Sequence, residues 1–318
     1  MAPRKVIIIG SGPAGLTAAL YCARANMNPL VLAGVTFGGQ LMNTTDVENY
    51  PGFPHGIQGP ELMQAMVDQA KRFGSEVIFD DVAKVDFSAR PFKVWVGSQE
   101  YSGETVIIAT GASSVWLGLP SEAKFRSKGI SSCATCDGFF FKGKELIVVG
   151  GGDAAIEEAI FLTKFATKVT LLNRSDKLRA SRIMQDRVLA HPKIQVLYNK
   201  SVVEFLGEES LTGGKIKDNV TGEITDMQFG GAFIAIGHKP NTEIFSAKGG
   251  SASGGQGQIE LDAKGYIVPH DNTKTNIEGV FVAGDVRDFR YRQAVTAAGM
   301  GCMASLDAEK FLAEHEKV

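Results

Sequence analysis

Two cysteines separated by two residues are the feature of the sequence that most directly permits chemistry. Cys133-Ala-Thr-Cys136 is followed at once by Asp137. Two thiols at this spacing can close a small disulfide, and such pairs often hold one thiol of lowered pKa that exchanges readily with other disulfides. Asp137 could move a proton to or from a thiolate; its alternative interpretation is an ordinary aspartate at a turn or helix end.

Other uses of this cysteine pair fit the sequence less well. A zinc site needs two further ligands, but the chain has no second Cys-x-x-Cys, and the nearest histidines in sequence are His55 and His191. A structural disulfide is typical of secreted proteins, and the apolar stretch at residues 6–9 is too short for a signal peptide. We therefore predict a redox-active pair and no metal site, with Cys22 and Cys302 as buried core residues.

The cysteine pair lies between two segments whose patterns predict a strand, a glycine turn, a helix and a second strand. In the first segment, the apolar run Val6–Ile9 precedes Gly10-x-Gly12-x-x-Gly15. In a dinucleotide-binding unit the first glycine permits the tight turn, the second lets backbone approach a pyrophosphate, and the third allows close helix packing. A glycine turn that merely packs against a sheet is the alternative. Because the second strand ends at Ala33-Gly34 without Asp or Glu, an NAD ribose is a weaker fit here.

The second segment repeats this pattern and ends in basic residues. Residues 146–149 predict a buried strand, Gly150-x-Gly152-x-x-Ala155 the turn, and residues 169–172 the second strand. Arg174 stands at the end of that strand and Arg179 could approach from the next turn, where an NADP site needs cations for the 2′-phosphate. A solvated basic loop is the alternative. Two such units predict two nucleotide ligands, with NADPH favoured for the second.

Length and composition limit the classes of protein that this chain could be. Its 318 residues suggest two domains, and its 37 glycines fall in clusters without a collagen-like period. The chain has 33 Lys and Arg residues and 35 Asp and Glu residues, so its net charge is only -2. This near balance argues against nucleic-acid binding and against a polybasic membrane anchor. No apolar run approaches the ~18 residues that would span a bilayer. With few cysteines and 44% hydrophobic residues, we expect a folded protein of the reducing cytoplasm.

Further features of the sequence carry expectations of their own. Asp285 follows a strand that ends at Gly284 and could reach a ribityl or ribose hydroxyl; the alternative is a helix N-cap. Phe139-Phe-Phe141 is expected to form buried or interface aromatic surface. The other expected elements are helices over 60–73, 156–165 and 292–314, strands near 231–236 and 279–284, and a glycine-rich loop over 249–257.

Taken together, the motifs resemble those of one family, the low-molecular-weight thioredoxin reductases, which use FAD and NADPH. The match extends over essentially the whole chain, and the order and spacing of its pieces are far more specific than any single piece. The pieces are Gly10-Ser-Gly-Pro-Ala-Gly15, Gly38-Gly-Gln-Leu41, Glu48-Asn-Tyr-Pro-Gly-Phe53, Ala109-Thr-Gly111, Cys133-Ala-Thr-Cys-Asp137, Gly150-Gly-Gly-Asp153, Ala235-Ile-Gly-His238 with Pro240-Asn241, and Gly284-Asp285 with Tyr291-Arg-Gln-Ala294.

The resemblance implies an α/β fold of two Rossmann-like three-layer domains. An NADPH domain (117–246), which carries the cysteine pair, would be inserted into a discontinuous FAD domain (1–116 and 247–318). The FAD contacts would fall on Gly10, Ser11, Gly12, Pro13, Ala14, Gly15, Gly39, Gln40, Leu41, Asn49, Val82, Gly284, Asp285, Arg292, Gln293 and Ala294. The NADPH contacts would fall on Gly150, Gly152, Asp153, Ala154, Arg174, Ser175, Arg179 and Gly237.

The resemblance also implies a reaction. Hydride would pass from NADPH to FAD, electrons would reach the Cys133–Cys136 disulfide, and Cys133 would exchange with the disulfide of thioredoxin. Cys136 would face the flavin, Asp137 would act as acid and base, the NADPH domain would rotate, and the protein would be a homodimer. One alternative is a flavin thioredoxin reductase fed by ferredoxin, against which the intact turn at Gly150 argues. A ferredoxin–NADP reductase would have no use for the cysteines, and a flavin-binding scaffold would leave them as turn residues.

One segment departs from the family pattern. Many relatives carry His-Arg-Arg where this chain has Asn173-Arg174-Ser175, so one expected phosphate-binding cation is missing. Arg174 and Arg179 remain, and Lys177 or Arg182 could compensate.

Overall fold

The chain folds into two compact units, and the second is inserted into the first. The computed structural model describes residues 3–245 and 258–315. One unit comprises Met1–Ser113 with Lys239–Val318, and the other Ser114–His238. The chain crosses between them at β9 (Ala112–Ser114) and β18 (His238–Pro240), which pair with each other. The expected junction at 116/117 lies near the first crossing; the one at 246/247 and the glycine-rich stretch 249–257 lie outside the described residues.

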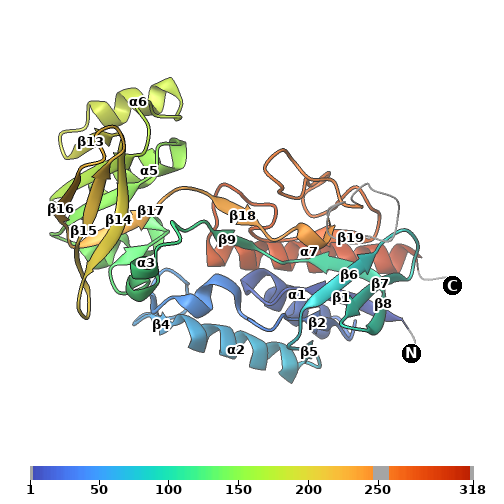
Figure 1. Cartoon of the computed structure of the whole chain (residues 1–318). Helices are drawn as coiled ribbons and strands as arrows, with labels where there is room; N and C mark the ends of the chain where they lie inside the picture. Colours follow the sequence, from blue (N-terminus) through green and yellow to red (C-terminus); the bar gives the residue numbers. More distant parts are fainter. Residues whose placement is uncertain (1–2, 246–257, 316–318) are drawn as a thin grey trace. The chain divides into compact units, whose positions relative to one another are not determined.

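The first unit is built on a sheet with the strand order β5-β2-β1-β8-β7-β6, and β19 pairs with the C-terminal half of β8. The strands β1, β2, β5, β8 and β19 are parallel, whereas β6 and β7 are antiparallel additions. Helices α1 and α7 run side by side along the sheet (Figure 1). The bounds are β1 Arg4–Ile9, α1 Pro13–Arg24, β2 Leu30–Leu32, η1 Gly39–Asn43, β3 Asp46–Val47, β4 Ile57–Gln58, α2 Gly59–Arg72, β5 Glu76–Ile78, β6 Val82–Asp86, β7 Phe92–Val96, β8 Gln99–Ile108, η3 Glu243–Phe245, β19 Val280–Val282 and α7 Ala294–His315.

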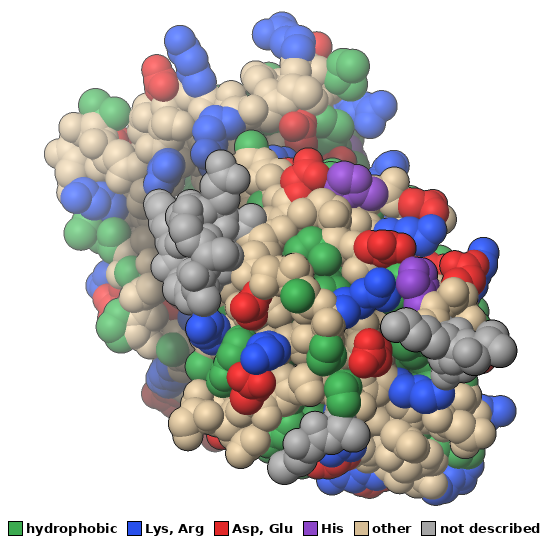
Figure 2. Space-filling model, turned by 90° about the vertical axis from the view of Figure 1, so that its right-hand side faces the viewer, with side chains coloured by type: hydrophobic (Ala, Val, Ile, Leu, Met, Phe, Trp, Pro, Cys, Tyr) green, Lys and Arg blue, Asp and Glu red, His purple; other side chains and the backbone are tan. Residues whose placement is uncertain are grey.

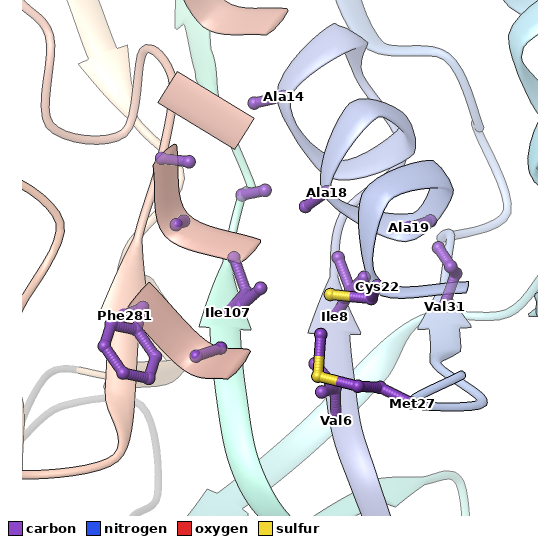
Figure 3. Packing of buried hydrophobic residues seen from close by; sticks show 14 of the residues in the cluster. Val6, Ile8, Ala14, Ala18, Ala19, Cys22, Met27, Val31, Ile107 and Phe281 are labelled. Atoms are coloured by element: carbon purple, nitrogen blue, oxygen red, sulfur yellow. The ribbon is translucent and has the colours of Figure 1, made fainter. Parts of the chain in front are cut away.

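The two faces of β1 belong to two different hydrophobic cores. Val6 and Ile8 are fully buried on the side of α1, where they share a cluster with Cys22 (Figure 3). The alternate residues Ile7 and Ile9 are buried in the cluster on the opposite face. A strand that is covered on both faces needs a continuous apolar run, which is what the sequence of β1 supplies.

The two free cysteines lie in different environments. Cys22 is fully buried, as predicted, and burial raises the pKa of its thiol to about 12. Cys302 is only half-buried and hydrogen-bonds with the exposed Tyr21, so its prediction as a core residue was wrong. One face of α7 is covered, and it carries small residues such as Ala297, Gly301 and Ala304.

The second unit contains a parallel sheet with the order β10-β17-β11-β12-β13 and an antiparallel sheet β14-β15-β16. Helix α5 packs on the parallel sheet through a core that includes Ile156, Leu162 and Phe233. Together the two units confirm the predicted α/β fold class. The bounds are α3 Pro120–Phe125, β10 Ile130–Ser131, α4 Ala134–Asp137, η2 Gly138–Phe141, β11 Glu145–Val149, α5 Asp153–Leu162, β12 Lys168–Asn173, α6 Arg182–Leu189, β13 Ile194–Tyr198, β14 Lys200–Gly207, β15 Leu211–Asp218, β16 Ile224–Gln228 and β17 Gly231–Ile234.

The distribution of surface charge bears on nucleic-acid binding, and the described residues bear on membrane insertion and on metal binding. On the face shown in Figure 2, acidic and basic side chains are interspersed. Within 3–245 and 258–315, no helix combines the length and the apolar character that crossing a membrane requires. The same residues contain no group of three or more His, Cys, Asp or Glu side chains placed to hold a metal ion.

Helices α1 and α7 approach so closely that the contact requires a glycine. A Cβ on Gly301 would lie 2.0 Å from the carbonyl oxygen of Ala14, whereas a Cβ on Gly299 of the same helix would meet nothing within 4 Å. We expect Gly301→Ala to lower the free energy of unfolding by about 1–3 kcal/mol, because the helices must separate. The control Gly299→Ala should raise it by about 0.5–1 kcal/mol, because alanine is the better helix former. Urea denaturation measures both; equal effects would contradict the close approach.

Candidate functional site

The three glycines of the first turn have different environments. Gly10 has φ +110°, and a Cβ there would lie 2.3 Å from the carbonyl oxygen of Ala109; a Cβ on Gly15 would lie 2.0 Å from the carbonyl oxygen of Gly10. By contrast, a Cβ on Gly12 would meet nothing within 4 Å. Gly10 and Gly15 are therefore required by the fold, while Gly12 borders open space at the N-terminus of α1. The N–H groups and the helix dipole favour an anion there.

A serine ties this turn to the neighbouring strand and loop. The buried Ser11 hydroxyl donates to the carbonyl oxygen of Ala33 at 2.7 Å and accepts from the N–H of Gly38 at 3.0 Å. These bonds shape the loop that leads into η1, which contains the predicted contacts Gly39, Gln40 and Leu41. A Cβ on Gly39 would lie 3.7 Å from the Cα of Gly12, so the loop and the turn border the same space.

Asp285 is partly buried, and its Oδ1 is enclosed. Among the described residues, its Oδ1 has no hydrogen-bond partner. Burial, and then the nearby charge of Asp288, raise the pKa of Asp285 to about 7, while Arg292 opposes the shift. It is not a helix N-cap, because α7 begins only at Ala294. A buried carboxylate oxygen that lacks a donor is costly, so this position is suited to a hydroxyl of a bound ligand.

A second aspartate, which the sequence analysis missed, shapes the segment before α7. Asp288 accepts hydrogen bonds from the N–H groups of residues 290, 291 and 292 at 2.9, 2.9 and 3.2 Å. Arg292 adopts φ +49° within this turn, and Gln293 accepts a bond from Asn49 at 3.5 Å. The structure thus brings the predicted residues Asn49, Arg292 and Gln293 together. An aspartate shortly before a helix was the available signal for Asp288.

The second glycine turn repeats the geometry of the first. Gly150 has φ +155°, and a Cβ there would lie 2.4 Å from a carbonyl oxygen just after β17, whereas a Cβ on Gly152 would meet nothing within 4 Å. Asp153 begins α5 and accepts from the N–H and the hydroxyl of Ser181 at 2.9 and 2.8 Å. These bonds lower the pKa of Asp153. Gly152 therefore borders open space at the N-terminus of α5, whose first turn includes the predicted Ala154.

The loop after β12 is folded around a buried asparagine. Asn173 Nδ2 donates to two carbonyl oxygens of the loop, that of Ser175 at 2.8 Å and another at 3.0 Å. Asn219, from outside the loop, donates to the carbonyl oxygen of Arg174 at 2.9 Å. The carbonyl groups thus accept from neighbouring amides, and the side chains of Arg174 and Arg179 are exposed. Both predicted cations are accessible to an anionic ligand.

Cys133 and Cys136 form a disulfide, with their Cα atoms 5.3 Å apart. Cys133 precedes the short helix α4, and its Sγ accepts a hydrogen bond from the N–H of Cys136 at 3.2 Å. The Thr135 hydroxyl lies 3.4 Å from the same sulfur, and Cys136 is exposed. Donors placed around a sulfur stabilise the thiolate that forms on reduction. The surroundings therefore distinguish Cys133 from Cys136.

Asp137 and three phenylalanines follow the disulfide. Burial raises the pKa of Asp137, and a hydrogen bond with Ser131 opposes this shift. Phe139 and Phe140 are 59% and 41% exposed, whereas Phe141 is buried. The ring of Phe139 packs edge-on against Phe140 and against Phe165. The run is thus divided between the core and an exposed aromatic surface beside the cysteines in sequence.

The remaining predicted residues lie at the ends of strands and helices. Gly284, with φ +79°, follows β19, and a Cβ there would lie 2.9 Å from Ala14 Cβ. Gly237, with φ +129°, accepts a hydrogen bond from Val115 at 3.0 Å. The first glycine turn and Asp285 belong to the first unit, and the second turn and the disulfide belong to the second. Val82 begins β6, Pro13 and Ala14 begin α1, and Ala294 begins α7.

Comparison with known proteins supports the resemblance drawn from the motifs. Residues 4–301 match the family of pyridine nucleotide-disulphide oxidoreductases. A thioredoxin reductase of Rickettsia conorii is 54% identical over 97% of this chain and 98% of its own length, and one of Streptomyces clavuligerus is 53% identical over 98% and 94%. The crystal structure of thioredoxin reductase from Streptococcus pyogenes matches with a TM-score of 0.91 and 41% identity, covering 98% of this chain and 99% of that one. The chain therefore belongs to the pyridine nucleotide-disulphide oxidoreductases and, within them, to the thioredoxin reductases.

Proposed function

We propose that the protein is an NADPH-dependent thioredoxin-disulfide reductase that contains FAD. One observation carries this proposal. The second unit contains both a glycine turn of the nucleotide-binding type and a disulfide, and the first unit contains a second turn of that type. Relatives at 54% and 53% identity are named thioredoxin reductases. The ferredoxin-fed alternative is not favoured, because an enzyme without a pyridine nucleotide would not need the open phosphate turn at Gly152.

The first unit suits FAD. The open space beside Gly12, at the N-terminus of α1, fits a pyrophosphate. Oδ1 of Asp285, which has no partner among the described residues, fits a ribityl hydroxyl. Asp288 fixes the turn that carries Arg292 and Gln293 toward the cofactor. When bound, the flavin supplies an acceptor for hydride and a donor of electrons to a disulfide.

The second unit suits NADPH. Open space beside Gly152 fits the pyrophosphate, and the exposed Arg174 and Arg179 are placed for the 2′-phosphate. Ser175 stands where many relatives have a cation, and its hydroxyl donates to a carbonyl oxygen of the same loop at 3.0 Å. It therefore supports the loop that carries Arg174. Arg182 forms an exposed ion pair with an aspartate of its own helix at 3.1 Å, so its charge is partly balanced within α6.

The surroundings of the disulfide support Cys133 as the exchanging thiol. After reduction, the N–H of Cys136 and the hydroxyl of Thr135 favour the thiolate of Cys133. This thiolate attacks one sulfur of the thioredoxin disulfide, which forms a mixed disulfide and releases the other sulfur as a thiolate. Cys136 then attacks Cys133, so that the internal disulfide is restored and reduced thioredoxin leaves. Asp137, whose pKa is raised by burial, exchanges the protons that these steps require.

Exposed aromatic side chains support a protein as the substrate of this disulfide. Phe139 and Phe140 lie just beyond the cysteine pair, in the same unit. Exposed apolar groups that gather beside a reactive group are typical of a protein-binding surface. We infer that they contact the apolar surface around the disulfide of thioredoxin.

The first unit also carries a surface suited to self-association. A groove between α1 and α2 is lined by apolar side chains that include Leu20, Tyr50, Phe53 and Met66. Exposed apolar residues continue over α1 and α7, namely Tyr21, Val295, Met303 and Leu306. We infer a homodimer that buries this surface, because water-exposed apolar area of this kind is unfavourable. We also infer that the protein works in the cytoplasm, where disulfides are kept reduced.

Anaerobic mixing with NADPH tests the proposed function. We expect NADPH to bleach the oxidised-flavin absorbance of the protein, and oxidised thioredoxin to restore it. Cys133→Ser should keep the bleaching and lose thioredoxin reduction, because the exchange step lacks its nucleophile. The control Cys302→Ser should keep both steps. If NADPH leaves the flavin oxidised, the proposal fails; if Cys133→Ser loses both steps, the assigned order of the cysteines is wrong.

Substitution of Arg174 tests the choice of nucleotide. We expect Arg174→Ala to raise the KM for NADPH about tenfold or more, because one charge-assisted contact with the 2′-phosphate is lost. The KM for NADH, which lacks that phosphate, should stay within about twofold. Arg187→Ala removes the same charge from an exposed position on α6 and should change neither value. A parallel rise for both nucleotides would remove Arg174 from the phosphate site.

Asp285 predicts how the stability of the flavin-free protein depends on pH. Its pKa in the folded protein is about 7, against 3.8 in the unfolded chain, so the folded state binds this proton more tightly. The resulting stabilisation is complete below the lower value and is lost as the pH rises through the higher one. We expect urea stability to fall across this window, and Asp285→Asn to reduce that fall and to be more stable than wild type above it. An unchanged pH profile in the variant would contradict the buried carboxylate.

A further inference from the structure

The end of β2 lacks the acidic residue that usually binds a ribose. In nucleotide-binding units of this architecture, an Asp or Glu after the second strand accepts a hydrogen bond from the ribose 2′-hydroxyl. Here Ala33 and Gly34 follow β2, and Gly34 has φ +82°. The first unit therefore carries a phosphate turn but no side chain at this position. If a ligand with an adenosine ribose binds here, the hydrogen-bond acceptor for its 2′-hydroxyl must come from another element.

Asp81 places a carboxylate at the vacant position. Its Oδ1 lies 3.2 Å from the point that a Cβ on Gly34 would occupy, and it accepts a hydrogen bond from the N–H of Val35 at 3.0 Å. Asp81 comes from the turn between β5 and β6, so it reaches the end of β2 from the neighbouring strand. A Cβ at residue 34 would be strained by the positive φ and would lie in tight contact with the carboxylate, so the glycine leaves room for the aspartate.

The backbone holds this turn firmly against β2. The N–H of Ala33 donates to the carbonyl oxygen of Ile78 at 2.8 Å, and that of Gly34 to the carbonyl oxygen of Asp80 at 3.2 Å. The carbonyl oxygen of Ala33 in turn accepts from Ser11 of the glycine turn at 2.7 Å. Asp81 thus stands on the edge of the sheet that carries the phosphate turn. Its side chain is exposed, and the hydrogen bond from Val35 engages its Oδ1.

We propose that Asp81 is a cofactor-binding residue that accepts a hydrogen bond from the 2′-hydroxyl of the adenosine ribose of FAD. The inference rests on the proposed binding of FAD to the first unit. Oδ1 holds the loop through Val35, and Oδ2 would accept the bond from the ribose. The acid that β2 lacks is in this way supplied by the turn that follows β5.

Affinity measurements with two flavins test this contact directly. The full-length chain is freed of flavin, and the dissociation constants of FAD and of FAD with a 2′-deoxyadenosine half are measured by fluorescence. We expect wild type to bind the deoxy analogue about tenfold more weakly than FAD, the scale of one charge-assisted hydrogen bond. Asp81→Asn, which can still accept from Val35, should bind FAD about tenfold more weakly and should no longer distinguish the two flavins.

A matched variant separates direct contact from charge. Asp80→Asn removes the same charge from the adjacent exposed residue, and we expect it to bind FAD at least as tightly as wild type, because one negative charge near an anionic ligand is lost. If Asp81→Asn weakens both flavins equally, or neither, Asp81 only supports the loop and the proposal is overturned. If wild type binds FAD and its 2′-deoxyadenosine analogue equally tightly, the role of Asp81 is overturned but the proposed function stands. If wild type does not bind FAD, the proposed function is overturned as well.

Discussion

Both units depend on one constraint: two backbone segments approach each other closely at the carboxyl end of a parallel strand. At Gly10 and Gly150 the backbone has positive φ, and a carbonyl oxygen lies 2.3 or 2.4 Å from the point that a Cβ would occupy. Because the turn is this tight, the next helix begins directly beyond the strand, and its free N–H groups border the space beside Gly12 or Gly152. Gly39 borders the space beside Gly12, and the N–H of Arg179 donates to the carbonyl oxygen of Gly151 beside the second turn.

The nesting of the two units explains how distant segments reach one site. β19 pairs with β8 in register from Val280↔Val106 onward, although the whole second unit lies between them in the chain. This pairing brings Gly284 so close to α1 that a Cβ would lie 2.9 Å from that of Ala14. Asp285 is thereby held beside the first glycine turn. Both the first sheet and the candidate site therefore need the part of the chain that follows the second unit.

Features set by local backbone could be predicted from the sequence, and features set by distant contacts could not. The glycine spacing from Gly10 and the Cys133 pair specify their geometry within a few residues, so the turns and the disulfide agree with expectation. Asn219 lies in the hairpin between β15 and β16 and donates to the carbonyl oxygen of Arg174, far away in sequence, and no short pattern marks such a contact. Cys302 was misjudged because composition does not reveal which face of a helix is covered.

Asn173, which departs from the family pattern, closes the loop after β12 through local contacts. A Cβ on Gly151 would lie 2.1 Å from Asn173 Oδ1, so a larger residue at 151 would force the asparagine side chain out of its present position. Its amide then donates to the carbonyl oxygens of Ser175 and Lys177, and the Gly151 carbonyl oxygen accepts from the N–H of Arg179 at 2.7 Å. A neutral amide cannot bind a phosphate as a cation does, but it closes the loop around itself. The loop that carries Arg174 and Arg179 is thereby held by several hydrogen bonds, and order in the free protein lowers the entropy that binding must remove.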